Sequence, residues 1–180
     1  AVKNQDMIYF SGITLAILDP SSRNNLFSCL KSVRRAGKKI AFDPNLRPKL
    51  WSDKKEMCDV IMAGAKLSDI ILPSFEDEKT WFSDADPMST LKRYRKVGAE
   101  IVVVKNAGEP VSFISNQGAG THPVETIRTA VDSTAAGDSF NSEILVGILR
   151  NIPLTEAIRN GVNLAKKVIM GHGALIKNDI

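Results

Sequence analysis

The sequence predicts an α/β protein with a mostly parallel sheet, and two observations support this prediction. Strand-like apolar runs and helix-like patterns alternate along the first hundred residues, as expected where helices connect parallel strands. Residues 101–105 begin with four consecutive aliphatic side chains, which is typical of a strand buried on both faces. We therefore expect helices to pack against a parallel sheet.

The first third of the chain contains two predicted strands and one helix. Residues 7–18 are an apolar stretch that we interpret as a buried strand running into a loop. Residues 24–36 repeat apolar side chains at helical spacing, and Gly37 ends the helix. Residues 39–43 are the next strand, and we expect its two following prolines to hold the loop 43–48 extended and stiff.

Two more predicted strand and helix pairs follow. Ser52 is expected to cap a helix over residues 53–65, and residues 69–72 form a short strand. Ser74 and Asp77 resemble a capping pair for a small helix that runs to Trp81. Pro87 opens a third helix that continues to Gly98, before the strand at 101–105.

After Gly108 the apolar period changes to two. The pattern predicts a hairpin at the sheet edge, made of residues 111–114, a turn at 116–118 and a second strand at 123–131. Residues 141–149 and 154–170 are the last predicted helices. Because the chain has no repeat, linker or low-complexity segment, we expect residues 1–180 to belong to a single domain.

Small residues fill the segment 131–140, which precedes the first of these helices. Ala135, Ala136 and Gly137 leave their backbone N–H groups uncovered, and a helix beginning at about Asp138 or Ser139 adds unpaired donors and a positive dipole end. This combination binds anions. Asp138 beside it suits a base that takes a proton from a hydroxyl attacking a phosphoryl group. The alternative is that Asp138 only caps the helix.

The segment 132–140 resembles the signature of the PfkB, or ribokinase-like, carbohydrate kinases, with Ser133 where threonine is usual. The resemblance extends, in the same order along the chain, to the segments 42–51, 72–78 and 103–106. Together they resemble the branch of the family that phosphorylates 2-keto-3-deoxygluconate. The similarity covers nearly the whole chain but only the C-terminal part of such a kinase. We therefore expect the N-terminal strands, the small lid and much of the sugar pocket to precede Ala1.

The resemblance implies a three-layer α/β/α fold and an ATP-dependent phosphorylation of a terminal hydroxyl of 2-dehydro-3-deoxy-D-gluconate. It implies that Asp138 binds the sugar and acts as catalytic base, while the Ala135, Ala136 and Gly137 amides form the anion hole and contact the nucleotide. Magnesium accompanies the ATP. The sequence has no G-x-x-x-x-G-K-[ST] motif, so this ATP site differs from a Walker P-loop.

Two further segments are assigned to ligands through the resemblance. Arg47 follows the strand 39–43, at the end of a parallel sheet where ligands bind, and its guanidinium can hold the sugar carboxylate by two hydrogen bonds. Asn45, Leu46 and Arg47 are expected to lie near the nucleotide as well; the alternative for Arg47 is a surface salt bridge.

The second segment follows the strand 101–105. By resemblance, Lys105, Asn106 and Gly108 lie along the nucleotide, whereas from the sequence alone this is a plain turn.

Two cation sites are also implied, each with an alternative. Asp132 and Thr134 occupy positions that help to hold a monovalent cation such as K⁺ in similar kinases, together with the loop 171–174; hydrogen bonding without an ion is the alternative. Ser74 and Asp77 stand where the wider family has Asn-x-x-Glu, which arranges magnesium and phosphate. Because both residues differ from that motif here, either Asp77 reaches the magnesium and phosphate through a water molecule, or Ser74 only caps the helix.

Composition restricts the partners. The 180 residues carry a net charge of +4 with no basic tract, which gives no case for nucleic acid, and no apolar run approaches the length of a membrane helix. The start lacks a signal-peptide pattern, and Cys29 and Cys58 fit reduced thiols, so we expect a cytoplasmic protein. His122 and His172 lack metal spacing.

The expected partners are a small sugar acid and ATP, with no nucleic acid or membrane, and a homo-oligomer stays open. The alternatives are a fructokinase or other PfkB sugar kinase, and a truncated nucleotide-binding domain without turnover. This chain alone is expected to be inactive, because it lacks the lid that excludes water.

Overall fold

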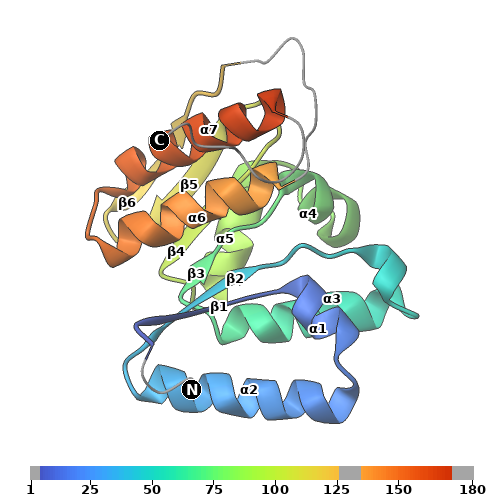
Figure 1. Ribbon diagram of the computed structural model, residues 1–180. Helices are drawn as coiled ribbons and strands as arrows, with labels where there is room; N and C mark the ends of the chain where they lie inside the picture. The colour runs from blue at the N-terminus through green and yellow to red at the C-terminus, as the bar shows by residue number, and fades with distance from the viewer. Residues whose placement is uncertain (1–4, 126–134, 172–180) are drawn as a thin grey trace. The chain divides into compact units, whose positions relative to one another are not determined.

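A computed structural model describes residues 5–125 and 135–171. It contains a six-stranded sheet in the order β1-β2-β3-β4-β5-β6 (Figure 1). The strands from β1 to β4 pair in parallel, and β5 pairs antiparallel to β4. The strand bounds are Met7–Ser11 (β1), Lys39–Asp43 (β2), Ile70–Ile71 (β3), Ile101–Val104 (β4), Val111–Ser115 (β5) and Gly118–His122 (β6). The predicted α/β fold with a mostly parallel sheet is confirmed.

Eight helical segments accompany these strands in the described residues. They are Gly12–Ile17 (α1), Pro20–Arg35 (α2), the short 3₁₀ segment Pro48–Leu50 (η2), Lys54–Lys66 (α3), Phe75–Phe82 (α4), Pro87–Lys96 (α5), Ala136–Leu149 (α6) and Leu154–Met170 (α7). The chain divides into two compact units. The first comprises Ala1–Asn106 and Ser112–Gly120, and the second comprises Ala107–Val111 and Thr121–Ile180. None of the described helices is both long and apolar enough to cross a membrane.

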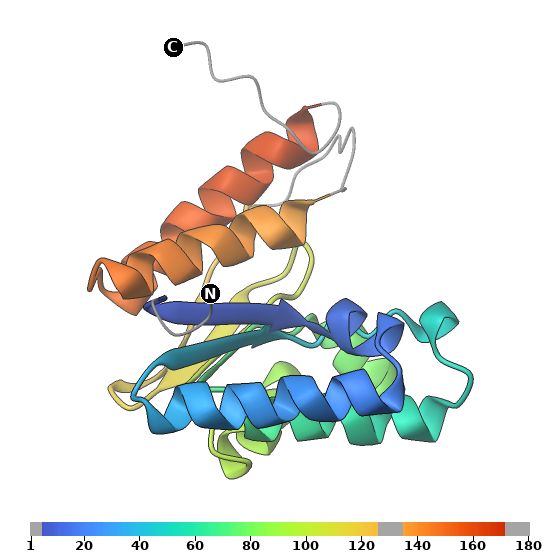
Figure 2. The same cartoon turned by 60° about the horizontal axis from the view of Figure 1, so that its bottom comes forward.

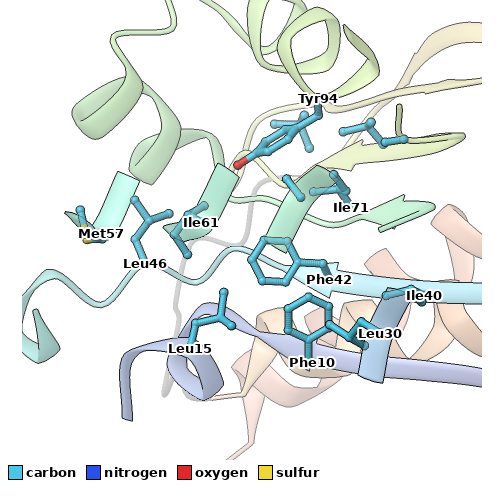
Figure 3. Packing of buried hydrophobic residues seen from close by; sticks show 14 of the residues in the cluster. Phe10, Leu15, Leu30, Ile40, Phe42, Leu46, Met57, Ile61, Ile71 and Tyr94 are labelled. Carbon is cyan, nitrogen blue, oxygen red and sulfur yellow. The ribbon is translucent and has the colours of Figure 1, made fainter. Parts of the chain in front are cut away.

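The core of the first unit lies where α2, α3 and α5 pack along one face of the sheet (Figure 2). Phe10 of β1 stacks on Phe42 of β2 with ring centroids 4.6 Å apart. Ile61 of α3 and Tyr94 of α5 lie close by in the same cluster (Figure 3). Alternate residues of each strand, such as Ile40 and Phe42, face these helices, as the period of two in a strand requires. This packing fixes the ends of β2, β3 and β4, where the candidate ligand groups lie.

Several predicted elements are confirmed at their bounds, and others begin elsewhere. Strand β2 and helix α7 occupy the predicted residues. The interpretation of residues 7–18 as a strand running into a loop is wrong in its second half, because β1 ends at Ser11 and residues 12–17 form helix α1. Helix α2 begins at Pro20, four residues before its prediction, since Asp19 accepts hydrogen bonds from the first-turn backbone amides.

Three capping and strand predictions also need correction. Asp53, not Ser52, caps α3 with its side chain, and Ser74 makes no side-chain cap bond at the start of α4. The second hairpin strand is Gly118–His122 rather than a strand from residue 123, of which only residues 123–125 are described. Two glycines give β6 a low intrinsic strand propensity, so its position is set by pairing within the sheet.

The second unit contains the antiparallel pair α6 and α7. Gly147 of α6 lies against Ala157, since an added Cβ would come within 2.5 Å of the Ala157 Cβ. Gly161 of α7 lies close to Phe140, since an added Cβ would come within 2.9 Å of the Phe140 ring. Small residues thus let the two helices approach closely, and this fixes the direction in which the start of α6 points within its unit.

Candidate functional site

The predicted site residues that the structure describes fall into two groups, one in each unit. The first group lies at the carboxyl ends of β2, β3 and β4, which meet at one edge of the sheet because these strands are parallel. It contains the loop 43–47, the start of α4, and residues 105 and 106. The second group is the start of α6, and Gly108 also belongs to the second unit.

A buried ion pair joins the ends of β2 and β4. Lys105 Nζ donates to Asp43 Oδ2 at 2.9 Å, and the two side chains are only 13% and 5% exposed. The Lys105 main chain is also fixed, because its N–H donates to the Pro73 carbonyl and its carbonyl accepts from the Phe75 N–H. Lys105 therefore anchors the start of α4 with its backbone and reaches Asp43 with its ammonium.

The loop after β2 adopts an unusual backbone. Asn45 has φ 28° and Arg47 has φ 45°, in the left-handed region that non-glycine residues seldom occupy. The prediction of an extended loop is therefore wrong. Each proline fixes only its own φ and biases the residue before it, so Pro44 leaves Asn45 free to turn.

Three contacts hold this turn. The Asn45 N–H donates to Asp43 Oδ1 at 3.1 Å, and the Trp51 Nε1–H donates to the Leu46 carbonyl at 2.9 Å. The Leu46 side chain is fully buried and points toward Met57 and Ile61 of α3 (Figure 3). Leu46 is thus an anchor of the loop, whereas Arg47 is exposed. Within residues 5–125 and 135–171, Arg47 forms no ion pair within 4.0 Å.

Asp77 of α4 is a half-buried carboxylate beside this loop. Burial raises the pKa of Asp77, while a hydrogen bond from the Leu46 N–H and the positive charge of Arg47 oppose that rise. The expected capping pair is wrong for the side chains, because Ser74 caps nothing with its hydroxyl and Asp77 instead accepts from the neighbouring loop. Asp77 therefore lies where it can interact with a ligand that is bound by the loop 45–47.

The turn after β4 differs in detail from its prediction. Asn106 is half-buried beside Lys105 in the first unit, and Gly108 is exposed in the second. The left-handed residue is Ala107, with φ 48°, rather than the glycine. An added Cβ at Gly108 would meet no described atom within 4 Å, so the glycine leaves open space on its own side of the turn.

The second group is built at the start of α6. The helix begins at Ala136, two to three residues before the predicted start at about Asp138 or Ser139, and Ala135 is its N-cap residue with φ 61°. The Ala135 carbonyl accepts the Ser139 N–H at 2.8 Å, which is the first helical bond. The N–H groups of Ala136, Gly137 and Asp138 consequently have no partner carbonyl within the helix. The backbone at this point has the donor set that binds an anion.

Asp138 is the third residue of α6, and its side chain is exposed. The alternative that it serves as the N-cap does not hold, since that position belongs to Ala135, which has no side-chain oxygen. An exposed carboxylate in the first turn lies on the same helix end as the uncovered amides. This arrangement can place a base next to a bound anion.

Asp132, Thr134 and His172 lie outside the described residues, as does most of the loop 171–174. Cys29 and Cys58 are free and half-buried. Within the described ranges, no group of three histidine, cysteine or acidic residues is placed to hold a metal ion.

The structure brings Asn45, Leu46, Arg47 and Lys105 to one edge, and it adds Asp43, which the sequence reasoning did not count as a site residue. The signal was present: an acidic residue at the end of one buried strand and a lysine at the end of another. Sequence reasoning missed the pair because the two residues are 62 positions apart and the strand order was not known.

Comparisons with known proteins agree on one family. A family model described as "pfkB family carbohydrate kinase" matches residues 1–180. The 2-dehydro-3-deoxygluconokinase of Haemophilus influenzae is 38% identical over 174 residues, which are 95% of this chain and 55% of that protein. A fructokinase of Klebsiella pneumoniae is 29% identical over 136 residues, 75% of this chain and 44% of that protein. The chain thus spans about half the length of the curated relatives it matches.

A solved structure shares the fold. The aminoimidazole riboside kinase of Salmonella enterica, crystallised with aminoimidazole riboside and an ATP analogue, superposes with a TM-score of 0.81 at 25% identity. The match covers 93% of this chain and 57% of that one.

Proposed function

Because the chain belongs to the pfkB family of carbohydrate kinases, we propose that its protein transfers a phosphoryl group from ATP to a terminal hydroxyl of 2-dehydro-3-deoxy-D-gluconate. The observation that carries the proposal is the start of α6, where uncovered backbone amides and the exposed Asp138 share one helix end. The similarity to 2-dehydro-3-deoxygluconokinase supports the choice of sugar acid.

In the proposed reaction Asp138 binds the attacking hydroxyl and accepts its proton as the new P–O bond forms, while the bond from the γ-phosphorus to the bridging oxygen breaks and ADP leaves. A carboxylate suffices as the base, because phosphoryl transfer passes through a loose transition state in which the proton can leave late. The amides of Ala135, Ala136 and Gly137 donate to the phosphoryl oxygens and stabilise the charge that develops there.

Arg47 supplies the selectivity for an acid in this proposal. Its exposed guanidinium can hold a carboxylate by two hydrogen bonds, and the left-handed backbone turns it out of the loop that Leu46 anchors. Asn45, Asn106 and Gly108 are assigned to the nucleotide. Lys105 supports the same edge from its ion pair with Asp43.

Magnesium would reach the site with ATP, since it usually keeps several waters and binds phosphates with only one or two carboxylates. Asp77 fits such a role through water, because it is a half-buried carboxylate at the same sheet edge. When bound, magnesium neutralises charge on the phosphate oxygens. We also propose a monovalent cation near Asp132 and Thr134, which potassium dependence of the activity would test.

The test compares ATP consumption with ketodeoxygluconate and with fructose, using the longest polypeptide that the gene encodes. Asp138→Asn is expected to lower kcat by about 10²–10⁴ while leaving the melting temperature unchanged. Glu143→Gln, a neutralised carboxylate further along α6, is the matched control. Retention of wild-type turnover by Asp138→Asn would overturn the assignment of the base.

A second candidate, fructose as the acceptor, is favoured by the similarity to a fructokinase. Arg47→Leu decides between the two sugars. It should raise KM for the sugar acid and leave KM for a neutral sugar nearly unchanged, and Lys49→Leu at the adjacent exposed cation controls for lost charge. Equal weakening of both sugars by Arg47→Leu excludes Arg47 as the acid-recognising group.

A further inference from the structure

One carboxylate of the first unit is shared between two loops that the proposed function assigns to ligands. Asp43 accepts from Lys105 Nζ through Oδ2 at 2.9 Å and from the Asn45 N–H through Oδ1 at 3.1 Å. Its side chain is 5% exposed, and that of Lys105 is 13% exposed. A hydrogen bond between two charged groups that are shielded from water restricts both side chains to a narrow range of positions.

The loop needs such support because its backbone is strained. The left-handed φ angles of Asn45 and Arg47 lie in a region that is disfavoured for residues with a Cβ, more strongly for Arg47 than for Asn45. Strain of this kind persists only where neighbouring contacts fix the conformation. The bond from the Asn45 N–H to Asp43 is one of these contacts, and the buried Leu46 is another.

The ion pair also connects strands that are not neighbours. Asp43 ends β2 and Lys105 follows β4, so the pair spans the end of the two-residue strand β3. The Lys105 backbone holds the start of α4 through Pro73 and Phe75. A shift of Lys105 would therefore move both its own turn and the contacts of the loop after β2.

From this geometry we propose that Asp43 is a positioning residue that holds the Arg47 loop and Lys105 in one arrangement. Lys105 directs its ammonium to Asp43, so it serves the site by positioning. This inference rests on the proposed function for its purpose, but the coupling between the two loops is a property of the protein without ligands.

The same unit offers a matched control at the other end of the strands. Asp69 accepts from the Ile40 N–H at 2.9 Å and from Arg34 Nε at 3.1 Å, and its side chain is also 5% exposed. Like Asp43, it accepts from a backbone N–H and from a cationic side chain. Because Asp69 precedes β3, it lies at the amino ends of the parallel strands, away from the ligand edge.

The experiment measures hydrogen–deuterium exchange of a peptide covering residues 44–51, without ligands, in the longest encoded polypeptide. Asp43→Asn keeps an acceptor for the Asn45 N–H and removes the charge facing Lys105. Asp43→Asn and Lys105→Met should each speed this exchange by about tenfold, because a hydrogen bond to a charged group is lost. Asp69→Asn should lower the melting temperature comparably and leave this peptide unchanged.

A double variant and a binding measurement complete the test. If both residues act through one contact, Asp43→Asn with Lys105→Met speeds exchange no more than either change alone. The same variants should weaken binding of a non-hydrolysable ATP analogue or of the sugar acid in calorimetry, and Asp69→Asn should not. Should Asp43→Asn fail to fold, Lys105→Met carries the same comparison.

The outcomes separate the inference from the proposed function. Exchange in residues 44–51 that is the same for Asp43→Asn and Asp69→Asn overturns the positioning role. Additive effects of the Asp43 and Lys105 changes overturn the coupling. A wild-type protein that binds neither ligand overturns the proposed function, while the exchange data still decide whether the two loops are coupled.

Discussion

Arg93 of α5 is the cation whose removal should have the largest effect on the stability of the first unit. Arg93 Nη2 lies 2.5 Å from Glu78 Oε2 and 2.6 Å from Asp84 Oδ2, and both carboxylates are buried, at 0% and 8% exposure. Its guanidinium also packs 4.1 Å from the centre of the Phe82 ring. Arg93→Met keeps most of the packing and leaves two buried carboxylates without their cation.

The loss should depend on pH. Burial raises the pKa of Glu78 to about 7, and the charge and hydrogen bond of Arg93 oppose that rise. Between its ordinary pKa of 4.5 and about 7, Glu78 binds more protons in the folded than in the unfolded state, so the free energy of unfolding falls as pH rises through this range. A rise of this size corresponds to roughly 3 kcal/mol.

Without Arg93 the pKa of Glu78 rises further, and the cost of ionising it grows. We expect Arg93→Met to lose about 3–5 kcal/mol at pH 8, the usual effect of breaking one side of a buried ion pair. At pH 5 the loss should be smaller, because Glu78 can take up a proton and needs no cation. Tyr94, whose hydroxyl lies 3.0 Å from both Glu78 oxygens, remains as a partner of the protonated acid.

Urea unfolding at pH 5, 6, 7 and 8 measures this, with fluorescence of Trp51 and Trp81 as the signal for the first unit. Arg95→Met is the control on the same helix, because Arg95 donates to the Ala99 and Glu100 carbonyls and to the Asn116 side chain, all neutral groups. Its loss of stability should be the same at every pH. Equal losses at pH 5 and pH 8 for Arg93→Met would refute the reasoning.

Three further predictions concern packing and reactivity. Gly12→Ala should destabilise the protein by about 1–3 kcal/mol in urea unfolding, because its Cβ would fall 1.7 Å from the Pro44 carbonyl oxygen; unchanged stability would show that the loop after β2 can move freely. Gly147→Ala should push α6 away from α7 and lower the free energy of unfolding, because its Cβ would lie 2.5 Å from the Ala157 Cβ. Ala157→Gly should lower the free energy of unfolding less on that background than in the wild type. Burial raises the pKa of the Cys58 thiol. At pH 8 a thiol reagent should therefore modify Cys58 more slowly in the folded than in the urea-unfolded protein, measured in a variant in which Cys29 is replaced by serine. Equal rates of modification would contradict the burial of Cys58.

Local patterns in the sequence determined much of this protein. Strand β2 and helix α7 have the predicted bounds, because their apolar periods are long or bounded by glycine and proline. The uncovered backbone amides at the start of α6 are also a local feature, since small residues before a helix leave the first-turn amides uncovered whatever packs elsewhere. The predicted α6 start at about Asp138 or Ser139 was two to three residues late, because the left-handed backbone of Ala135 cannot be predicted from an alanine side chain.

Tertiary structure decided the features that depend on residues distant in sequence. The segment after Ser11 became a helix rather than a loop because Leu15 is buried in the core, and β6 formed within the sheet despite its glycines. The Asp43 and Lys105 pair required β2 and β4 to flank β3, and the sequence does not state strand order. Hydrophobic periodicity reports which face of an element is buried, whereas the partner of a buried charge is chosen by how the elements pack.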